Sequence, residues 1–248
     1  MTASNSLEWS IDLSDERSVI SAVDDNLSKF DDIFIKCSKE RLKLPIFEPN
    51  KDHPYFNAIR DLQLPSNPNY KQRPFLLMND LPTDGNVGIT DTSDLEELSQ
   101  IKECLVVLGT SGSGKTRTLV ELLCKKYGFY FTGLTKENPG SCDLSMMINH
   151  LLPRLRDSLT QNDIYAIRFC KCLLFARIYI LNYLLKNYGK ISPYNWALLQ
   201  LCPIHFFGSD IFEEFTLEFR KVSEQFLGNE FWSLIHNILN TVNQVGFS

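Results

Sequence analysis

The sequence predicts an α/β protein with a small, incomplete parallel sheet and a large helical lobe. Three observations lead to this prediction: a glycine-rich loop at residues 109–116, a short apolar run on each side of the loop and its following helix, and helical patterns from residue 160 onward. Apolar runs of this kind are typical of strands buried in a parallel sheet. The order strand, loop, helix, strand would form the start of that sheet.

The loop reads GTSGSGKT and fits the phosphate-binding pattern G-x-x-x-x-G-K-[ST]. Its backbone amides would cradle the phosphates at the start of a helix, because glycines allow an anion to approach closely. Lys115 would reach the β- and γ-phosphates, and the Thr116 hydroxyl would ligate Mg²⁺. The predicted cofactors are therefore ATP and Mg²⁺, with ATP preferred because no Asn-Lys-x-Asp guanine motif is present. The predicted nucleotide-binding residues are Gly109, Thr110, Ser111, Gly112, Ser113, Gly114, Lys115 and Thr116.

The flanks of the loop agree with this interpretation. Residues 105–108 (LVVL) form the apolar run before the loop, and residues 129–132 (FYFT) form the one after it. Between them, apolar residues at helical spacing follow Lys115, and Gly128 predicts the end of that helix. Together these segments predict a core like that of the P-loop NTPases.

The N-terminal part, residues 1–90, is acidic and then proline-rich, and we place a domain boundary near residue 90. Ser14 can cap a helix whose Val19, Ile20, Val23, Leu27 and Phe30 share one face. Two aspartate pairs, at 24–25 and 31–32, could suggest a metal site, but carboxylates beside an apolar stripe usually form a solvated face. Seven of the eleven prolines lie within 45–82, which indicates a linker or extended chain with one strand at 75–78.

The second part, residues 91–248, is predicted to hold the nucleotide-binding domain with its helical lobe. A short helix at 91–100 leads into the first strand, and a capping-box pattern at 160–163 opens a long helix that runs to Gly189. Charged residues interrupt this helix, so it is a core helix and not a membrane span. Further helices are predicted from Ser192 to before Pro203, from Asp210 to Gly228, and from Asn229 onward.

Arg177 lies on the side of the long helix opposite its polar stripe, which is formed by Arg168, Lys171, Asn182 and Lys186. Two interpretations compete for it: an arginine that reaches a bound phosphate, and an arginine in a salt bridge or with its charge extended to the surface. We favour the second interpretation.

The composition narrows the classes of function. The chain of 248 residues has a net charge of −5, and neither half carries a basic block interleaved with aromatic residues, so nucleic-acid binding by this chain alone is not expected. The seven cysteines are scattered through apolar segments and indicate buried, reduced thiols. No signal sequence or membrane span is recognisable, and an intracellular location is expected.

ATP hydrolysis by a P-loop protein ordinarily requires a second site, an apolar strand that ends in Asp and helps to hold Mg²⁺. The nearest candidate is residues 204–210, but its Asp210 fits better as a helix cap. We therefore predict nucleotide binding with weak or no hydrolysis, unless a partner protein or a missing C-terminal domain supplies the carboxylate.

Residues 109–133 (GTSGSGKTRTLVELLCKKYGFYFTG) resemble the P-loop NTPase module of Crinkler-type effector-like proteins of fungi and oomycetes. In that family GKTRT precedes a helix and an aromatic Gly-Phe-Tyr-Phe strand. Weaker likenesses occur at residues 74–80 and 196–215. The resemblance implies an NTPase module, carried here by Gly109, Gly114, Lys115 and Thr116. The family's N-terminal translocation segment and C-terminal effector domain are not recognisable, which suggests a truncated member.

Two alternative functions remain open at this stage. A nucleoside or nucleotide kinase uses a similar loop, and the candidates for its acceptor base and lid would be Asp143 and the pair Arg154 and Arg156. A non-enzymatic interaction protein could instead keep the loop as a structural or switching element, ordered by a nucleotide that it does not consume.

Overall fold

Nearly all of the regular secondary structure in the part of the chain that the structure describes is helical. The computed structural model describes residues 16–67, 73–82, 88, 92–101, 106–108, 110, 112–133 and 139–225. These residues contain ten α-helices and no sheet. Their only β-pairing consists of two isolated antiparallel bridges, Ile46 with Pro65 and Ser66 with Pro74. The predicted α/β fold with a parallel sheet is therefore wrong for this part of the chain, whereas the large helical lobe is confirmed.

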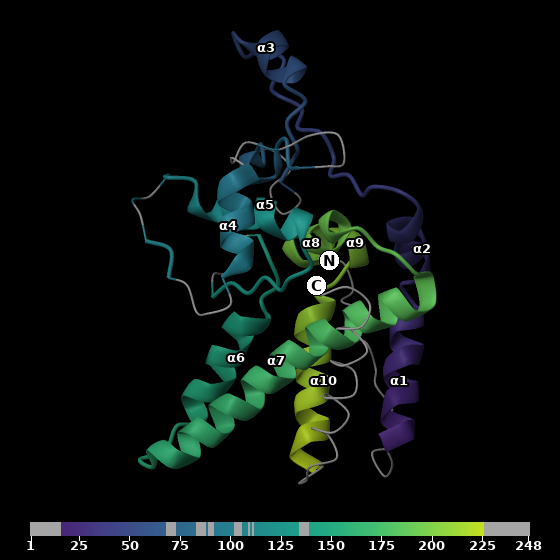
Figure 1. Cartoon of the computed structure of the whole chain (residues 1–248), viewed down its shortest axis with the longest axis vertical. Helices are drawn as coiled ribbons and strands as arrows, with labels where there is room; N and C mark the ends of the chain where they lie inside the picture. The colour runs from purple at the N-terminus through teal and green to yellow at the C-terminus, as the bar shows by residue number, and fades with distance from the viewer. Residues whose placement is uncertain are drawn as a thin grey trace.

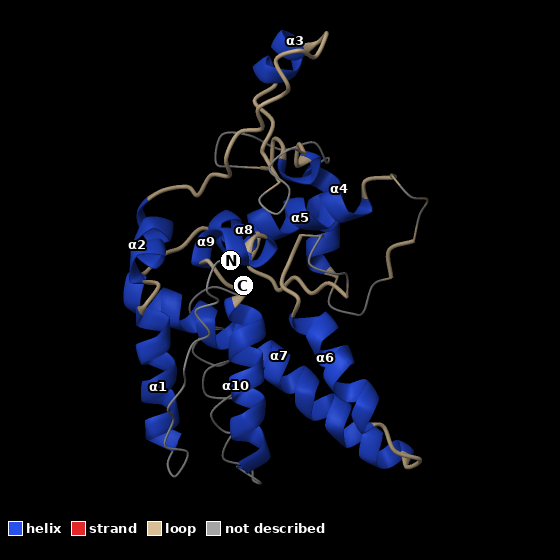
Figure 2. Cartoon of the chain, turned by 180° about the vertical axis from the view of Figure 1, so that it is seen from behind, coloured by secondary structure: helices blue, strands red, loops and turns tan. Residues whose placement is uncertain are grey.

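In chain order the α-helices are α1 Glu16–Ser28, α2 Asp31–Lys39, α3 Phe56–Asp61, α4 Thr92–Gln100, α5 Lys115–Lys125, α6 Asp143–Leu151, α7 Leu159–Tyr188, α8 Pro193–Leu201, α9 Pro203–Phe207 and α10 Ile211–Gln225. The 3₁₀ helices are η1 Leu76–Met78 and η2 Leu152–Arg154. The long helix α7 crosses the molecule, with α6 beside its N-terminal half and α10 packed against it, while α3 lies at the end of a projecting arm (Figures 1 and 2).

Helix α7 is the long helix that the sequence predicts, although it begins earlier than expected. Its N-cap is Ser158, whose hydroxyl accepts from the amide of Gln161 at 3.4 Å, and not the predicted cap at residue 160. Gly189 ends the helix with φ of 76°, a conformation that favours glycine. Lys171 and Lys186 of the polar stripe are exposed. Among the described residues, no helix is long and apolar enough to cross a membrane.

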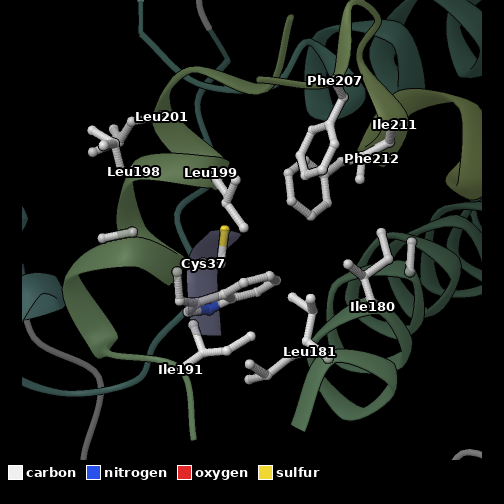
Figure 3. Packing of buried hydrophobic residues seen from close by; sticks show 14 of the residues in the cluster. Cys37, Ile180, Leu181, Ile191, Leu198, Leu199, Leu201, Phe207, Ile211 and Phe212 are labelled. Carbon is white, nitrogen blue, oxygen red and sulfur yellow. The ribbon is translucent and has the colours of Figure 1, made fainter. Parts of the chain in front are cut away.

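Helix α8 occupies the centre of the main hydrophobic core. Trp196 is fully buried, and the core draws residues from helices at both ends of the chain. Figure 3 shows this convergence, with Cys37 of α2, Leu181 of α7, Leu199 of α8 and Phe212 of α10 facing a common interior. The helix itself follows the prediction, because Ser192 caps it and Pro193 is its first residue.

The N-terminal helices pack against α7 through their apolar faces, as the sequence pattern predicts. Val23 and Leu27 are buried, and the tyrosine hydroxyls of α7 bond the acidic residues next to them. Tyr179 donates to Asp24 Oδ1 at 2.8 Å, and Tyr188 donates to Asp31. Burial, followed by the neighbouring carboxylate, raises the pKa of Tyr179. These two aspartates therefore join helices, while their neighbours at 25 and 32 are exposed.

Neither of the two predicted strands beside the loop forms in the described residues. Val106 and Leu108 are irregular and exposed, at 72% and 86%, so this run is not a buried strand. The segment 128–132 is buried to a larger degree, but side chains of α8 take the place of a neighbouring strand. The carbonyl of Gly128 accepts from Trp196 Nε1 at 2.9 Å and Gln200 Nε2 at 3.0 Å, and the amide of Tyr130 donates to Gln200 Oε1 at 3.0 Å.

The proline-rich segment also differs from its prediction in one place. The strand expected at 75–78 is the short 3₁₀ helix η1, whose Met78 is buried. The short helix expected at 91–100 is confirmed as α4. The predicted helix from Asn229 and the cap at Ser14 lie outside the described residues.

Five of the six described cysteines are buried and all six are free thiols. Burial raises the pKa of the Cys37, Cys124 and Cys202 thiols to about 12. A thiol with such a pKa is almost fully protonated near neutral pH and reacts poorly. The interpretation of the cysteines as buried thiols is confirmed for five of the six described cysteines, while Cys170 is exposed.

Candidate functional site

The glycine-rich loop leads directly into α5, as the motif predicts. Gly112 and Gly114 have φ of 81° and 84°, in the left-handed region where a residue with a side chain is strained. A Cβ built on either glycine meets nothing within 4 Å, so the loop is open on the side of these two residues. Gly109 and Ser111, which belong to the predicted site, lie outside the described residues.

The side chain of Lys115 folds back across the loop. Its Nζ donates to the carbonyl of Thr110 at 2.7 Å and to Ser113 Oγ at 3.1 Å. The amide of Ser113 donates to the same Thr110 carbonyl at 3.3 Å and closes the turn. Thr116, the predicted magnesium ligand, is exposed on the first turn of α5. The structure therefore brings the ammonium group and the helix start together on one side of the loop.

Arg117 anchors the loop helix to the segment that contains η1, a role that the sequence analysis missed. Its guanidinium donates to the backbone carbonyls of Leu77 at 2.9 Å, Asp80 at 2.7 Å, and Asn79. Its Nε also donates to Glu121 Oε1 at 2.5 Å, and the Glu121 side chain is fully buried. Because one side chain bonds three carbonyls about 40 residues away, the direction of α5 is fixed. The helical spacing of Arg117 and Glu121 was the only available signal.

A second cluster of charged groups lies in the interior, around Arg177 of α7. Arg177 and Asp143 are both fully buried, and Arg177 donates to Asp143 Oδ2 from Nη2 at 2.8 Å and Nε at 3.2 Å. Its guanidinium carbon lies 4.0 Å from the Phe212 ring centroid and 5.0 Å from that of Phe131. Burial lowers the pKa of Arg177, and the Asp143 carboxylate opposes that shift. The salt-bridge interpretation of Arg177 is confirmed.

Asp210 is a helix cap and not the end of a strand. Its Oδ1 accepts from the amide of Glu213 at 3.3 Å, and its Oδ2 accepts from the amide of Cys142 at 2.7 Å. Burial raises the pKa of Asp210. The side chains of Cys142, Asp210 and Glu213 lie within 4.8 Å of one another. However, both Asp210 oxygens already accept amide protons and Arg177 supplies a positive charge nearby, so the group fits a helix cap better than a metal site.

Residues 204–210, the candidate for an acidic strand, contain most of helix α9 and a turn at Gly208. Arg154 and Arg156, the candidate lid arginines of a kinase, are exposed at the turn between α6 and α7, at the far end of that helix pair (Figure 1). Asp143, the candidate acceptor base, is enclosed with Arg177. These three residues are therefore not gathered around the loop.

Glu214 lies next to this cluster on α10, and its partly buried carboxyl group should make the unfolding free energy depend on pH. Burial raises the pKa of Glu214 above its ordinary value of 4.5, and the carboxylates of Asp210 and Glu213 act in the same direction. A raised folded-state pKa means that the stabilising contribution is complete below about pH 4.5 and is lost as the pH rises through the folded-state pKa. We therefore expect the unfolding free energy of the wild type, relative to Glu214→Gln, to fall as the pH rises above about 4.5.

Urea denaturation of both proteins at several pH values would measure this difference. The exposed Glu97 of α4 provides the matched control, because Glu97→Gln removes the same charge from a solvated position. Parallel stability curves for the wild type and Glu214→Gln would contradict the expectation.

Comparison with known proteins adds no assignment: no family model, no curated protein and no solved structure matches the chain. The resemblance of residues 109–133 to Crinkler-type proteins stays a prediction.

Proposed function

We propose that the chain binds a magnesium nucleotide, ATP in the first instance, at loop 109–116. The observation that carries this proposal is the position of Lys115 Nζ, which lies over the loop at 2.7 Å from the Thr110 carbonyl, at the start of α5. A phosphate at this position would be attracted by the charge of the ammonium group and, separately, by the dipole of the helix.

The start of α5 has the capacity to receive an anion. The first amides of an α-helix have no acceptor within the helix. In α5 the N-cap is Gly114, which has no side chain to cap them. Left-handed glycines at 112 and 114 turn the backbone without placing a Cβ in the space before the helix. Phosphate oxygens could therefore approach the amides, and the exposed Thr116 could contact a magnesium ion bound to them.

Two partners of Lys115, the Thr110 carbonyl and the Ser113 hydroxyl, are weaker acceptors than a phosphate. A carbonyl and a hydroxyl are neutral, whereas hydrogen bonds between an ammonium and a phosphate are charge-assisted and about twice as strong. Exchange of these two bonds for contacts to the β- and γ-phosphates would be favourable. The loop would close on its ligand with α5 held in place by Arg117.

Binding is proposed without rapid hydrolysis. Activation of water by P-loop enzymes requires an acidic group beside the magnesium ion, and among the described residues the nearest sequence candidate, Asp210, is committed to two backbone amides. The purified chain is therefore expected to bind ATP and to release phosphate slowly or not at all.

Isothermal titration calorimetry with ATP and millimolar Mg²⁺ tests the proposal. We expect Lys115→Ala to weaken binding by about 10- to 100-fold, the equivalent of one lost charge-assisted interaction. Lys51→Ala, which removes the same charge from an exposed position on the projecting arm, is the control and should bind like the wild type. Thr116→Val should reduce the gain in affinity that Mg²⁺ provides.

Two outcomes would contradict the proposal. The first is the absence of heat with well-folded wild-type protein, and the second is equal affinity of the wild type and Lys115→Ala. Fast phosphate release that disappears in Lys115→Ala would support the loop as the site but contradict slow hydrolysis, and would place the missing carboxylate elsewhere in the chain.

A further inference from the structure

A cavity lies at the opposite end of α5 from the loop. It is bounded by that end, by the C-terminal end of α2 and by the N-terminal end of α8. Its volume is about 490 Å³, which is within the range of pockets for small organic ligands. Four basic side chains line it, from Lys39, Arg41, Lys125 and Lys190, and one acidic side chain, from Glu40.

Within the described residues, the basic side chains that line this cavity outnumber the acidic ones. Glu40 pairs with Lys36 across 3.7 Å, and this lysine is not part of the cavity wall. Within the described residues, no carboxylate pairs with Lys39, Lys125 or Lys190. The whole chain carries a net charge of −5, so the charge at this cavity is opposite in sign to the charge of the whole chain. An anion bound here would relieve the repulsion between these groups.

Arg41 is held in place by two independent contacts. Its guanidinium carbon lies 4.2 Å from the centroid of the Tyr194 ring, a stacked cation–π arrangement. The backbone on both sides of it is fixed by the buried Asn195, whose Oδ1 accepts from the amide of Leu42 at 2.9 Å and whose Nδ2 donates to the carbonyl of Glu40 at 2.8 Å. An arginine that already rests against an aromatic ring loses less entropy when it binds a phosphate or carboxylate.

We propose that this cavity binds a small phosphorylated organic molecule. A phosphoryl group carries close to two negative charges and three acceptor oxygens, which matches several cations better than a single carboxylate does. The volume exceeds that of phosphate alone, so the remainder would hold an organic group beside Pro82 and Pro193. The site is separate from loop 109–116, because its α5 residues, Cys124 and Lys125, end the helix that the loop begins.

The test uses ribose 5-phosphate as the probe, with ribose and inorganic phosphate for comparison, in a Lys115→Ala background that weakens the loop site. Calorimetry should detect ribose 5-phosphate and no heat from ribose. The double substitution Lys125→Gln with Lys190→Gln should weaken the affinity at least about tenfold. Lys39→Gln with Lys190→Gln is a second pair of exposed positions and should act alike.

The matched control is Lys51→Gln with Lys221→Gln, which changes the net charge equally at exposed positions outside the cavity wall. Circular dichroism establishes that each variant is folded. The proposal is overturned if folded protein binds neither phosphate compound, if ribose binds as well as its phosphate, or if the control pair weakens binding as much as the cavity pairs. Because loop binding is measured by the effect of Lys115→Ala on ATP, failure of either proposal leaves the other standing.

Discussion

Replacement of Asp143 by Ala is expected to lower the unfolding free energy by about 3 to 5 kcal/mol, because it leaves Arg177 charged and unpaired in the interior. Both side chains are fully buried, and Asp143 Oδ2 accepts two hydrogen bonds from the guanidinium. Gln200, at 3.4 Å, and the charge of the nearby Asp210 carboxylate remain, but neither replaces the two hydrogen bonds to Asp143. Urea denaturation followed by far-ultraviolet circular dichroism would measure the loss.

Two variants show whether the loss arises from the ion pair. Asp157→Ala, at an exposed position, should change stability by less than about 0.5 kcal/mol. Asp143→Leu combined with Arg177→Met removes both charges, and it should cost much less than the two single substitutions together. A cost for Asp143→Ala no greater than that for Asp157→Ala would show that the buried pair does not contribute in this way.

Asn195→Ala is expected to cost about 3 kcal/mol, because it removes the partner of two buried backbone groups and of a third that is partly buried. The side-chain oxygen of Asn195 accepts from the Leu42 amide at 2.9 Å. Its side-chain nitrogen donates to the Cys37 and Glu40 carbonyls at 2.8 Å each. Asn195 is 2% exposed, so water cannot easily replace these bonds. Thermal or urea unfolding would measure the effect.

The control for Asn195 is Asn187→Ala near the end of α7, where the side chain is exposed and the change should be below about 0.5 kcal/mol. A similar small effect at Asn195 would contradict the expected result. The Asn195 variant should also weaken ribose 5-phosphate binding, because the chain beside Arg41 would lose its attachment to α8.

Local features of the fold could be predicted from the sequence because short-range chemistry determines them. The start of α5 follows from two glycines and a lysine, and the start of α8 follows from Ser192 and Pro193. Asp210 as a cap could be predicted in the same way, from its position three residues before a glutamate. In each case the residues that decide the conformation lie within one helical turn.

The parallel sheet could not be decided in this way, because a strand depends on neighbours far away in the chain. An apolar run of four residues fits a strand or a packed irregular segment equally well. The Gly128 carbonyl and the Tyr130 amide are bonded by a side chain of α8, some 70 residues later. The phosphate-loop motif predicted a turn and a helix correctly, but it carries no information about the segments on either side.

Long-range pairs explain what else was missed at the candidate sites. Asp143 and Arg177 are 34 residues apart, and Arg117 meets carbonyls 37 to 40 residues before it. The basic cavity combines segments from near residues 40, 125 and 190. In the sequence, Lys39, Lys125 and Lys190 each look like ordinary surface residues, and only the folded chain places them around one cavity.

The substitution of side chains for a strand at Gly128–Tyr130 changes which positions the protein can vary. In a β-ladder the backbone supplies both donors and acceptors, so evolution is free to exchange the side chains of the neighbouring strand. Here the side chains cannot be exchanged so freely, because Trp196 and Gln200 themselves supply the hydrogen bonds. The identity of two residues, Trp196 and Gln200, therefore matters more here than that of any residue of a neighbouring strand would. A substitution at either position would remove a hydrogen bond to this backbone unless another side chain replaced it.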